Sequence, residues 1–203
     1  MKHDEGVIKF NCQWTQTGPL DKMSIADINT WREKLFELKL IGVTDDDIGY
    51  GNISIRFRQN QFIISGSGTG KLAKLDELHY ALVTGYNVAE NSLSATGPIL
   101  ASSESLTHAM VYENAPSAQA VMHVHHDLLW NKLLRDLPAT APGIEYGTPE
   151  MAREIVRLFQ EQNLLKNRIF AMAGHHGGVV CFGTSLDEAG DLLIERFREV
   201  WPV

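Results

Sequence analysis

The strongest constraint on the fold is a pair of short segments in which polar and apolar residues alternate. Residues 52–57 alternate in this way, and residues 61–65 do so again after Gln59 and Asn60. A period of two is the pattern of a strand with one buried face, and so short a gap joins two strands as an antiparallel hairpin. We therefore expect a mixed or largely antiparallel sheet.

Helical patterns are interleaved with these strands along the chain of 203 residues. Apolar periodicity predicts helices over residues 24–40, 104–113, 149–162 and 185–200. Ser24 and Thr148 are the predicted caps of the first and third, and Ser185 with Glu188 forms a predicted capping box at the start of the last. Further strands are predicted over residues 119–126, 168–173 and 178–182. Such interleaving predicts a single α/β domain in which helices cover the faces of the sheet.

Composition limits the kinds of binding partner and the cellular compartment that we expect for this protein. A formal net charge of −7, with lysine and arginine scattered, argues against a nucleic-acid-binding surface. No run of eighteen apolar residues occurs and the first residues do not resemble a secretory signal, so we expect a cytoplasmic protein without a membrane span. The two cysteines are too few for a disulfide framework and too far apart for a metal clip.

Five of the eight histidines fall into two short groups. Side chains two apart on a strand share one face, so His123 and His125 can direct both imidazoles to the same point, whereas His126 faces the other way. The second group, His175 and His176, lies among glycines between two predicted strands, and one of the two could complete a three-histidine catalytic metal site. The pattern leaves open which one.

A carboxylate and possible anion-binding groups accompany these histidines. Glu104 stands at a predicted helix start, where it is either a plain helix-terminal acid or an acid/base beside the metal. Ser102 and Ser103 precede it and suit anion binding at a helix N-terminus. The glycine-rich segment 66–70 either offers backbone N–H groups to a phosphate or is a plain flexible turn.

Taken in order, five short motifs resemble the class II aldolase/adducin family. They occupy residues 51–54, 65–66, 102–104, 123–125 and 174–175, and the likeness runs from about Ser24 to Arg198. The resemblance implies a three-layer α/β/α sandwich with a central mixed, largely antiparallel sheet. It implies one domain over residues 1–203, with residues 1–23 as an N-terminal arm that matches nothing in the family, and a homotetramer with sites between subunits.

The resemblance also assigns the site residues. It implies a divalent metal, usually zinc, held by His123, His125 and His175, with Glu104 as the catalytic acid/base. A Gly-His-x-x-Gly pattern favours His175 as the third ligand, although His176 followed by glycine mimics the family's common His-Gly. The positions that match the family's substrate-binding residues are Asn52, Gly66, Ser102 and Ser103.

The implied function is a metal-dependent aldolase-type lyase. Its substrate would be a small hydroxy-carbonyl compound, a sugar phosphate by resemblance, cleaved through a metal-stabilised enediolate. A glutamate at position 104 is similar to the aldolases and dehydratases, whereas the epimerases carry aspartate there. The segment 65–70 departs from the family's Thr-Pro-Ser-Gly-like run, which leaves phosphate recognition open. The alternatives are a dehydratase or epimerase of the same family, and a non-catalytic adducin-like interaction module.

Overall fold

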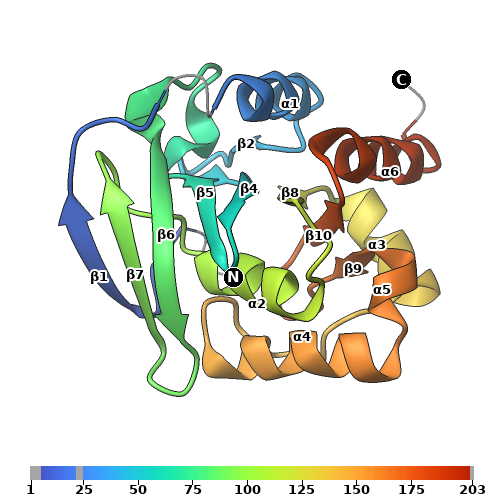
Figure 1. The fold of residues 1–203 in the computed structure, drawn as a ribbon. Coiled ribbons are helices and arrows are strands. Elements are labelled where there is room, and N and C mark those ends of the chain that lie inside the picture. The colour runs from blue at the N-terminus through green and yellow to red at the C-terminus, as the bar shows by residue number, and fades with distance from the viewer. Residues whose placement is uncertain (1–5, 22–24, 202–203) are drawn as a thin grey trace.

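A computed structural model describes residues 6–21 and 25–201. Its centre is an eight-stranded sheet with the strand order β1-β7-β6-β5-β4-β8-β10-β9 (Figure 1). These strands are β1 (Asn11–Gln16), β4 (Asn52–Arg58), β5 (Gln61–Ser65), β6 (Tyr80–Asn87), β7 (Ser92–Gly97), β8 (Ala120–His125), β9 (Ile169–Ala171) and β10 (Gly178–Gly183). A separate two-stranded ladder joins β2 (Gly42–Val43) and β3 (Gly49–Tyr50).

The helices lie on both faces of this sheet. They are α1 (Ala26–Glu37), α2 (Ser105–Asn114), α3 (Asp127–Asp136), α4 (Pro149–Glu161), α5 (Leu164–Asn167) and α6 (Leu186–Arg198). One apolar core contains the buried residues of α2, α4 and α5, and a second contains those of α1, α3 and α6 (Figure 1). The predicted three-layer α/β/α architecture is confirmed.

The sheet is mixed and largely antiparallel, as predicted. In the described part of the chain, β1 pairs with β7 in parallel and the other neighbouring strands pair antiparallel. The predicted hairpin is present as β4 and β5, with Gln59 and Asn60 between them. Gln59 has a positive φ of 48°, a conformation that suits a tight turn.

Strand β8 lies near the middle of the sheet and determines where the histidines point. Along β8, Val121 belongs to the core on the α2 side and Met122 to the core on the opposite side. The alternation therefore directs His123 and His125 toward the α2 side. On the neighbouring strands, Asn52 is the register partner of His123 and Gly178 is the partner of His125.

Several elements differ from the sequence prediction. Helix α1 ends at Glu37, before the predicted end at Leu40, because Lys39 adopts a positive φ of 57° that no right-handed helix can contain. The predicted cap, Ser24, lies outside the described residues. The structure adds β6, β7 and α3, and residues 11–16 form an edge strand of the main sheet. In the described ranges, no helix is both long and apolar enough to cross a membrane.

Candidate metal centre

Three imidazoles converge at the end of β8. One ligand nitrogen from each of His123, His125 and His175 can be chosen so that all lie within 4.8 Å of one another. The Nε2 atoms of His123 and His125 are 3.0 Å apart. His123 and His125 extend from one face of β8, and His175 comes from the turn between β9 and β10. This arrangement offers three nitrogen donors to one ion.

Backbone groups orient the ligand nitrogens. The Nδ1 of His123 lies 3.2 Å from the carbonyl oxygen of Val179, so this nitrogen can donate its proton there and Nε2 carries the free lone pair. The His125 ring likewise donates a hydrogen bond to the backbone of His176. Fixing a metal-binding imidazole through its second nitrogen is the usual arrangement at protein metal sites.

Burial keeps the three imidazoles neutral. It lowers the pKa of His123 to about 4 and holds the pKa values of His125 and His175 well below the ordinary histidine value. An uncharged ring is the form that binds a cation, so no proton has to leave these rings at neutral pH. Three neutral nitrogen donors match the protein ligands of a catalytic zinc site.

The structure distinguishes between His175 and His176, which the sequence left as alternatives for the third ligand. His175 joins the cluster, whereas the side chain of His176 is 63% exposed and its Nδ1 lies 3.5 Å from Oδ1 of Asp127. His126 lies on the opposite side of the sheet, as the strand alternation predicts, with its ring packed on Phe197. Its Nδ1 accepts a hydrogen bond from the N–H of Leu129 at the start of α3.

Glu104 lies beside the imidazoles at the N-terminus of α2. Its Oε1 is 3.5 Å from Nε2 of His175 and 3.9 Å from Nε2 of His123, and the residue is 1% exposed. Its other oxygen accepts a 2.6 Å hydrogen bond from the hydroxyl of Thr107. Glu104 occupies the N-cap position but makes no side-chain capping hydrogen bond, so helix capping does not account for its orientation.

The surroundings of Glu104 tune its acidity. Burial raises the pKa of this carboxyl from 4.5 to about 7, while the Thr107 hydrogen bond and the positive charge of Lys9 oppose the rise. Of its two oxygens, Oε1 makes no hydrogen bond within the described residues. A carboxyl with a pKa near neutrality can both take up and release a proton, which is what general acid/base chemistry requires.

The predicted substrate-binding residues border the cluster. Asn52, Ser102 and Ser103 are buried, and the Oδ1 of Asn52 makes no hydrogen bond within the part of the chain that is described. The hydroxyl oxygen of Ser102 accepts a 3.3 Å hydrogen bond from the N–H of Glu104. Gly66 forms an isolated antiparallel bridge with Ala101, which places the glycine loop next to the serine pair.

The glycine loop itself uses several of its N–H groups internally. Gly66 donates to the carbonyl of His79, Ser67 to that of Leu100, and Thr69 to that of Gly66. The guanidinium of buried Arg32 donates to the carbonyls of Thr69 and Gly70, and these hydrogen bonds help to fix the loop. The loop is therefore a fixed turn.

Sequence reasoning missed three side chains around the site. Thr107 carried a signal, because a residue three positions after Glu104 on a helix lies on the same face. Two tyrosines carried none: the Tyr50 ring lies 5.4 Å from that of His125, and the Tyr146 ring lies 4.6 Å from that of His175, measured between ring centroids. Both contacts join segments that are distant in sequence.

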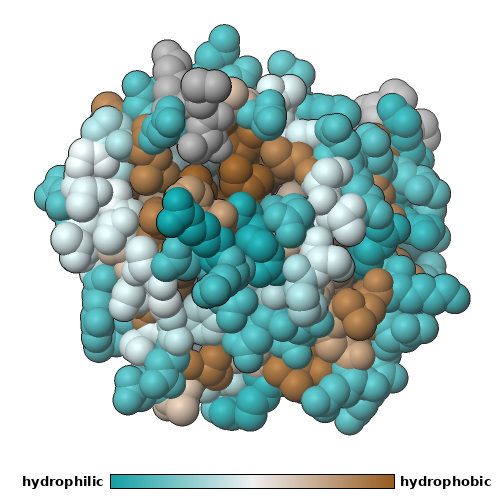
Figure 2. Space-filling view, viewed as in Figure 1, coloured by the Kyte–Doolittle hydropathy of each residue, from teal (hydrophilic) through white to brown (hydrophobic). Residues whose placement is uncertain are grey.

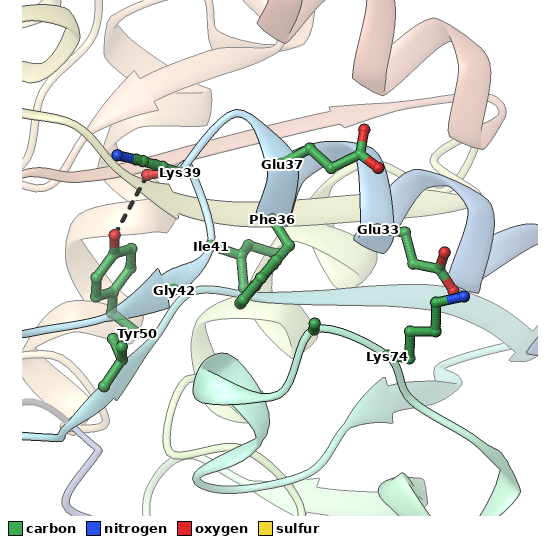
Figure 3. Close-up of a pocket in the computed structure, with 10 residues that line it drawn as sticks. Glu33, Phe36, Glu37, Lys39, Ile41, Gly42, Tyr50 and Lys74 are labelled. Atoms are coloured by element: carbon green, nitrogen blue, oxygen red, sulfur yellow. Dashed lines mark hydrogen bonds between the residues drawn. The ribbon is translucent and has the colours of Figure 1, made fainter.

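Tyr50 also lines a cavity of about 570 Å³. Figure 3 shows its lining, from the end of α1, from β2 and β3, and from residues 73–74, with the hydroxyl of Tyr50 donating to the carbonyl of Lys39 at 3.3 Å. In Figure 2 the visible face is mainly hydrophilic, with hydrophobic residues gathered around a hollow near its upper centre. The described residues that line this cavity include neither the three imidazoles nor Glu104.

Part of the chain matches the model of a known family. Residues 44–130, which include Glu104, His123 and His125, match the model of the Class II Aldolase and Adducin N-terminal domain. Over these residues the chain is similar to the class II aldolase and adducin family. The resemblance to this family that the sequence predicted is thereby confirmed.

Relatives within the class II aldolase family agree with this assignment. The chain is 29% identical over 147 residues to L-fuculose phosphate aldolase of Escherichia coli K12, a match that spans 64% of this chain and 62% of that relative. The matches to the corresponding aldolases of Shigella flexneri and another E. coli strain have the same identity and coverage. The chain thus matches less than two thirds of these relatives.

Solved structures share the fold. YgbL from Klebsiella pneumoniae has a TM-score of 0.66 at 20% identity, with 89% of this chain and 88% of that chain covered. A structure of L-fuculose 1-phosphate aldolase has a TM-score of 0.65 at 20% identity, with 90% and 84% covered. At this level of identity the likeness establishes the class II aldolase fold alone.

Proposed function

We propose that this protein is a metal-dependent aldolase-type lyase that acts on a small hydroxy-carbonyl compound, with a sugar phosphate as the first choice of substrate. The observation that carries the proposal is the convergence of three neutral imidazoles with a buried carboxyl whose oxygen lies 3.5 Å from one of their nitrogens. A binding module has no need of such a grouping. The family-model match and the similarity to aldolases support the same reaction class.

The metal centre in this proposal consists of His123, His125 and His175, with zinc as the ion. When bound, a divalent metal would act as a Lewis acid on the carbonyl and adjacent hydroxyl oxygens of the substrate. The donors fit such an ion because all three rings are uncharged and because backbone groups orient two of them. Neutral ligands also leave the positive charge of the ion undiminished.

Glu104 is the proposed acid/base. Its Oε2 is fixed by Thr107, so that Oε1 faces the imidazoles, at the position where a carbon next to the substrate carbonyl would exchange its proton. The burial that raises the pKa of Glu104 to about 7 lets the carboxyl serve in both directions near neutral pH. The surrounding core excludes bulk water from this proton transfer.

Asn52, Gly66, Ser102 and Ser103 are the proposed substrate-binding residues. Asn52 is positioned by its register with His123, so its side-chain amide can contact a substrate held at the cluster. The two serines supply hydroxyl donors at the N-terminus of α2, where an anionic group is favoured. Gly66 would contribute no side chain, because one there would collide with Ile99, and its N–H already donates to the carbonyl of His79.

The experiment incubates the zinc-loaded protein with a panel of ketose and aldose phosphates and their unphosphorylated counterparts, and follows products by mass. Cleavage yields two fragments, dehydration yields a product lighter by one water, and epimerisation leaves the mass unchanged. Glu104→Gln is the matched control, since it keeps the shape of the side chain. No metal-dependent turnover of any member of the panel would contradict the proposal.

We further propose a homotetramer, which light scattering would test.

A further inference from the structure

The segment that precedes β1 reaches the metal centre through one loop. The N–H of Val7 donates to the hydroxyl of Tyr146 at 3.1 Å, and the Lys9 ammonium lies 4.3 Å from the centre of the Tyr146 ring. The same ammonium forms a 3.0 Å ion pair with Glu145, and the Lys9 side chain is only 15% exposed. Val7 and Lys9 thus contact residues 144–147 through a hydrogen bond, a cation–π contact and an ion pair.

That loop is packed directly against the third imidazole. Tyr146 is 3% exposed, and the centre of its ring lies 4.6 Å from that of His175. A Cβ atom placed on Gly174 would lie 2.2 Å from the carbonyl oxygen of Ile144, so only glycine allows the two backbones to approach this closely. The position of His175 therefore depends on where residues 144–147 lie.

The other side of the loop contacts the serine pair. Gly147 has a positive φ of 67°, and a Cβ atom on it would lie 3.2 Å from the carbonyl of Ser103 and 3.5 Å from Cβ of Lys9. The backbone at Gly147 is consequently enclosed between the N-terminal segment and the residue that precedes Glu104. One loop supports both the third imidazole and the start of α2.

His175 needs this support more than the other two imidazoles do. His123 and His125 extend from a strand that is hydrogen-bonded on both sides, by β4 and β10. His175 lies in the turn between β9 and β10, where its N–H bonds to the carbonyl of Met172 and its carbonyl accepts from Gly178. A turn at the end of two strands fixes a side chain less firmly than the interior of a sheet does.

We propose that residues 7–9 and 144–147 form a clamp that holds His175 in its metal-binding position, with Tyr146 as the positioning residue. The inference rests on the metal centre of the proposed function. Tyr146 acts through the His175 ring, and Lys9 acts through Tyr146 and Glu145. The clamp makes the N-terminal segment, which the family motifs do not include, a part of the metal site.

The test measures the zinc dissociation constant by competition with a chromophoric chelator, together with the visible spectrum of the cobalt-substituted protein. Tyr146→Leu should weaken zinc binding by about 10- to 100-fold, the usual loss when a group supporting a ligand is removed, and should change the cobalt spectrum. Tyr146→Phe keeps the ring on His175 and should retain most of the affinity. Lys132→Met, on α3, is the control for loss of an ion-paired lysine.

Lys9→Met separates positioning from simple electrostatics. Removal of a nearby positive charge should by itself tighten the binding of a cation. The clamp predicts the opposite, an affinity about tenfold weaker, because the Tyr146 ring loses its cation–π partner. Lys9→Met keeps the proposal testable even if Tyr146→Leu fails to fold, which melting curves in chelator would reveal.

The outcomes distinguish the clamp from the proposed activity. Wild-type affinity and an unchanged cobalt spectrum in Tyr146→Leu, or tighter zinc binding in Lys9→Met, would overturn the clamp and leave the lyase proposal standing. A wild-type protein that binds zinc but cleaves no substrate would overturn the lyase proposal, while the affinities of the variants would still decide the clamp. A wild-type protein that binds no divalent metal would overturn both.

Discussion

Glu104→Gln should stabilise the metal-free protein at neutral and alkaline pH while it slows the proposed chemistry. Burial raises the pKa of Glu104 from 4.5 to about 7, so the folded state binds this proton more tightly than the unfolded state does. The free energy of unfolding therefore falls as the pH rises from about 4.5 to about 7 and stays lower above that range. Glutamine carries no charge, and its amide oxygen can still accept from Thr107.

The size of the effect follows from the change in pKa. At about 1.4 kcal/mol for each pKa unit, ionised Glu104 costs about 3 kcal/mol of stability at pH 8, and Glu104→Gln should recover this amount. For a chain of this size that corresponds to roughly 6–12 °C in melting temperature. Near pH 5 the difference between variant and wild type should fall below about 1 kcal/mol.

Urea unfolding in the presence of a chelator, near pH 5 and near pH 8, measures both quantities. Glu195→Gln, an exposed position on α6, is the control for the same chemical change. If Glu104→Gln is no more stable than wild type near pH 8, or if its advantage does not depend on pH, the carboxyl does not ionise at the cost deduced from its burial. Such a result would also remove the reason to regard Glu104 as an acid poised near neutrality.

Three further predictions concern the loaded protein. His123→Ala should lose the metal, whereas His126→Ala, on the opposite side of the sheet, should retain it. Elemental analysis of the purified variants measures the metal content of both. Full occupancy in His123→Ala would contradict the ligand assignment. On any substrate that wild type turns over, Glu104→Gln should lower turnover by about 10²- to 10⁴-fold, and an unchanged rate would exclude Glu104 as the acid/base. Thr107→Val removes a hydrogen bond that lowers the pKa of Glu104, so the limb of the pH–rate profile due to this carboxyl should move to higher pH, and a shift to lower pH would refute the contact.

Local patterns in the sequence predicted the elements whose signals are complete within a few residues. The hairpin turned at Gln59 and Asn60 is present, and Thr148 caps α4 by accepting from Met151. The predicted capping box at Ser185 is half right: Ser185 accepts from the N–H of Glu188, but the Glu188 carboxylate accepts from Thr184 instead. A carboxylate with several donors in reach selects among them by tertiary geometry.

Other elements had no local signal of this kind. Strand β7 contains small and polar residues whose alternation is visible only once its neighbours bury every second side chain. Helix α3 is capped by His126 instead of one of the usual capping residues, so its start did not resemble a helix N-terminus. In both cases the chain adopts the element because of packing against segments distant in sequence.

The sequence by itself determined that His123 and His125 share a face, because a strand's period of two is a local property of the backbone. Only the tertiary structure decided that His175, and not His176, joins them, because the direction of a side chain in a turn depends on what packs against that turn. The raised pKa of Glu104 was likewise a tertiary outcome, since burial is produced by the whole fold around a residue. Sequence order supplied the donors, and long-range packing decided their orientation, charge and shared centre.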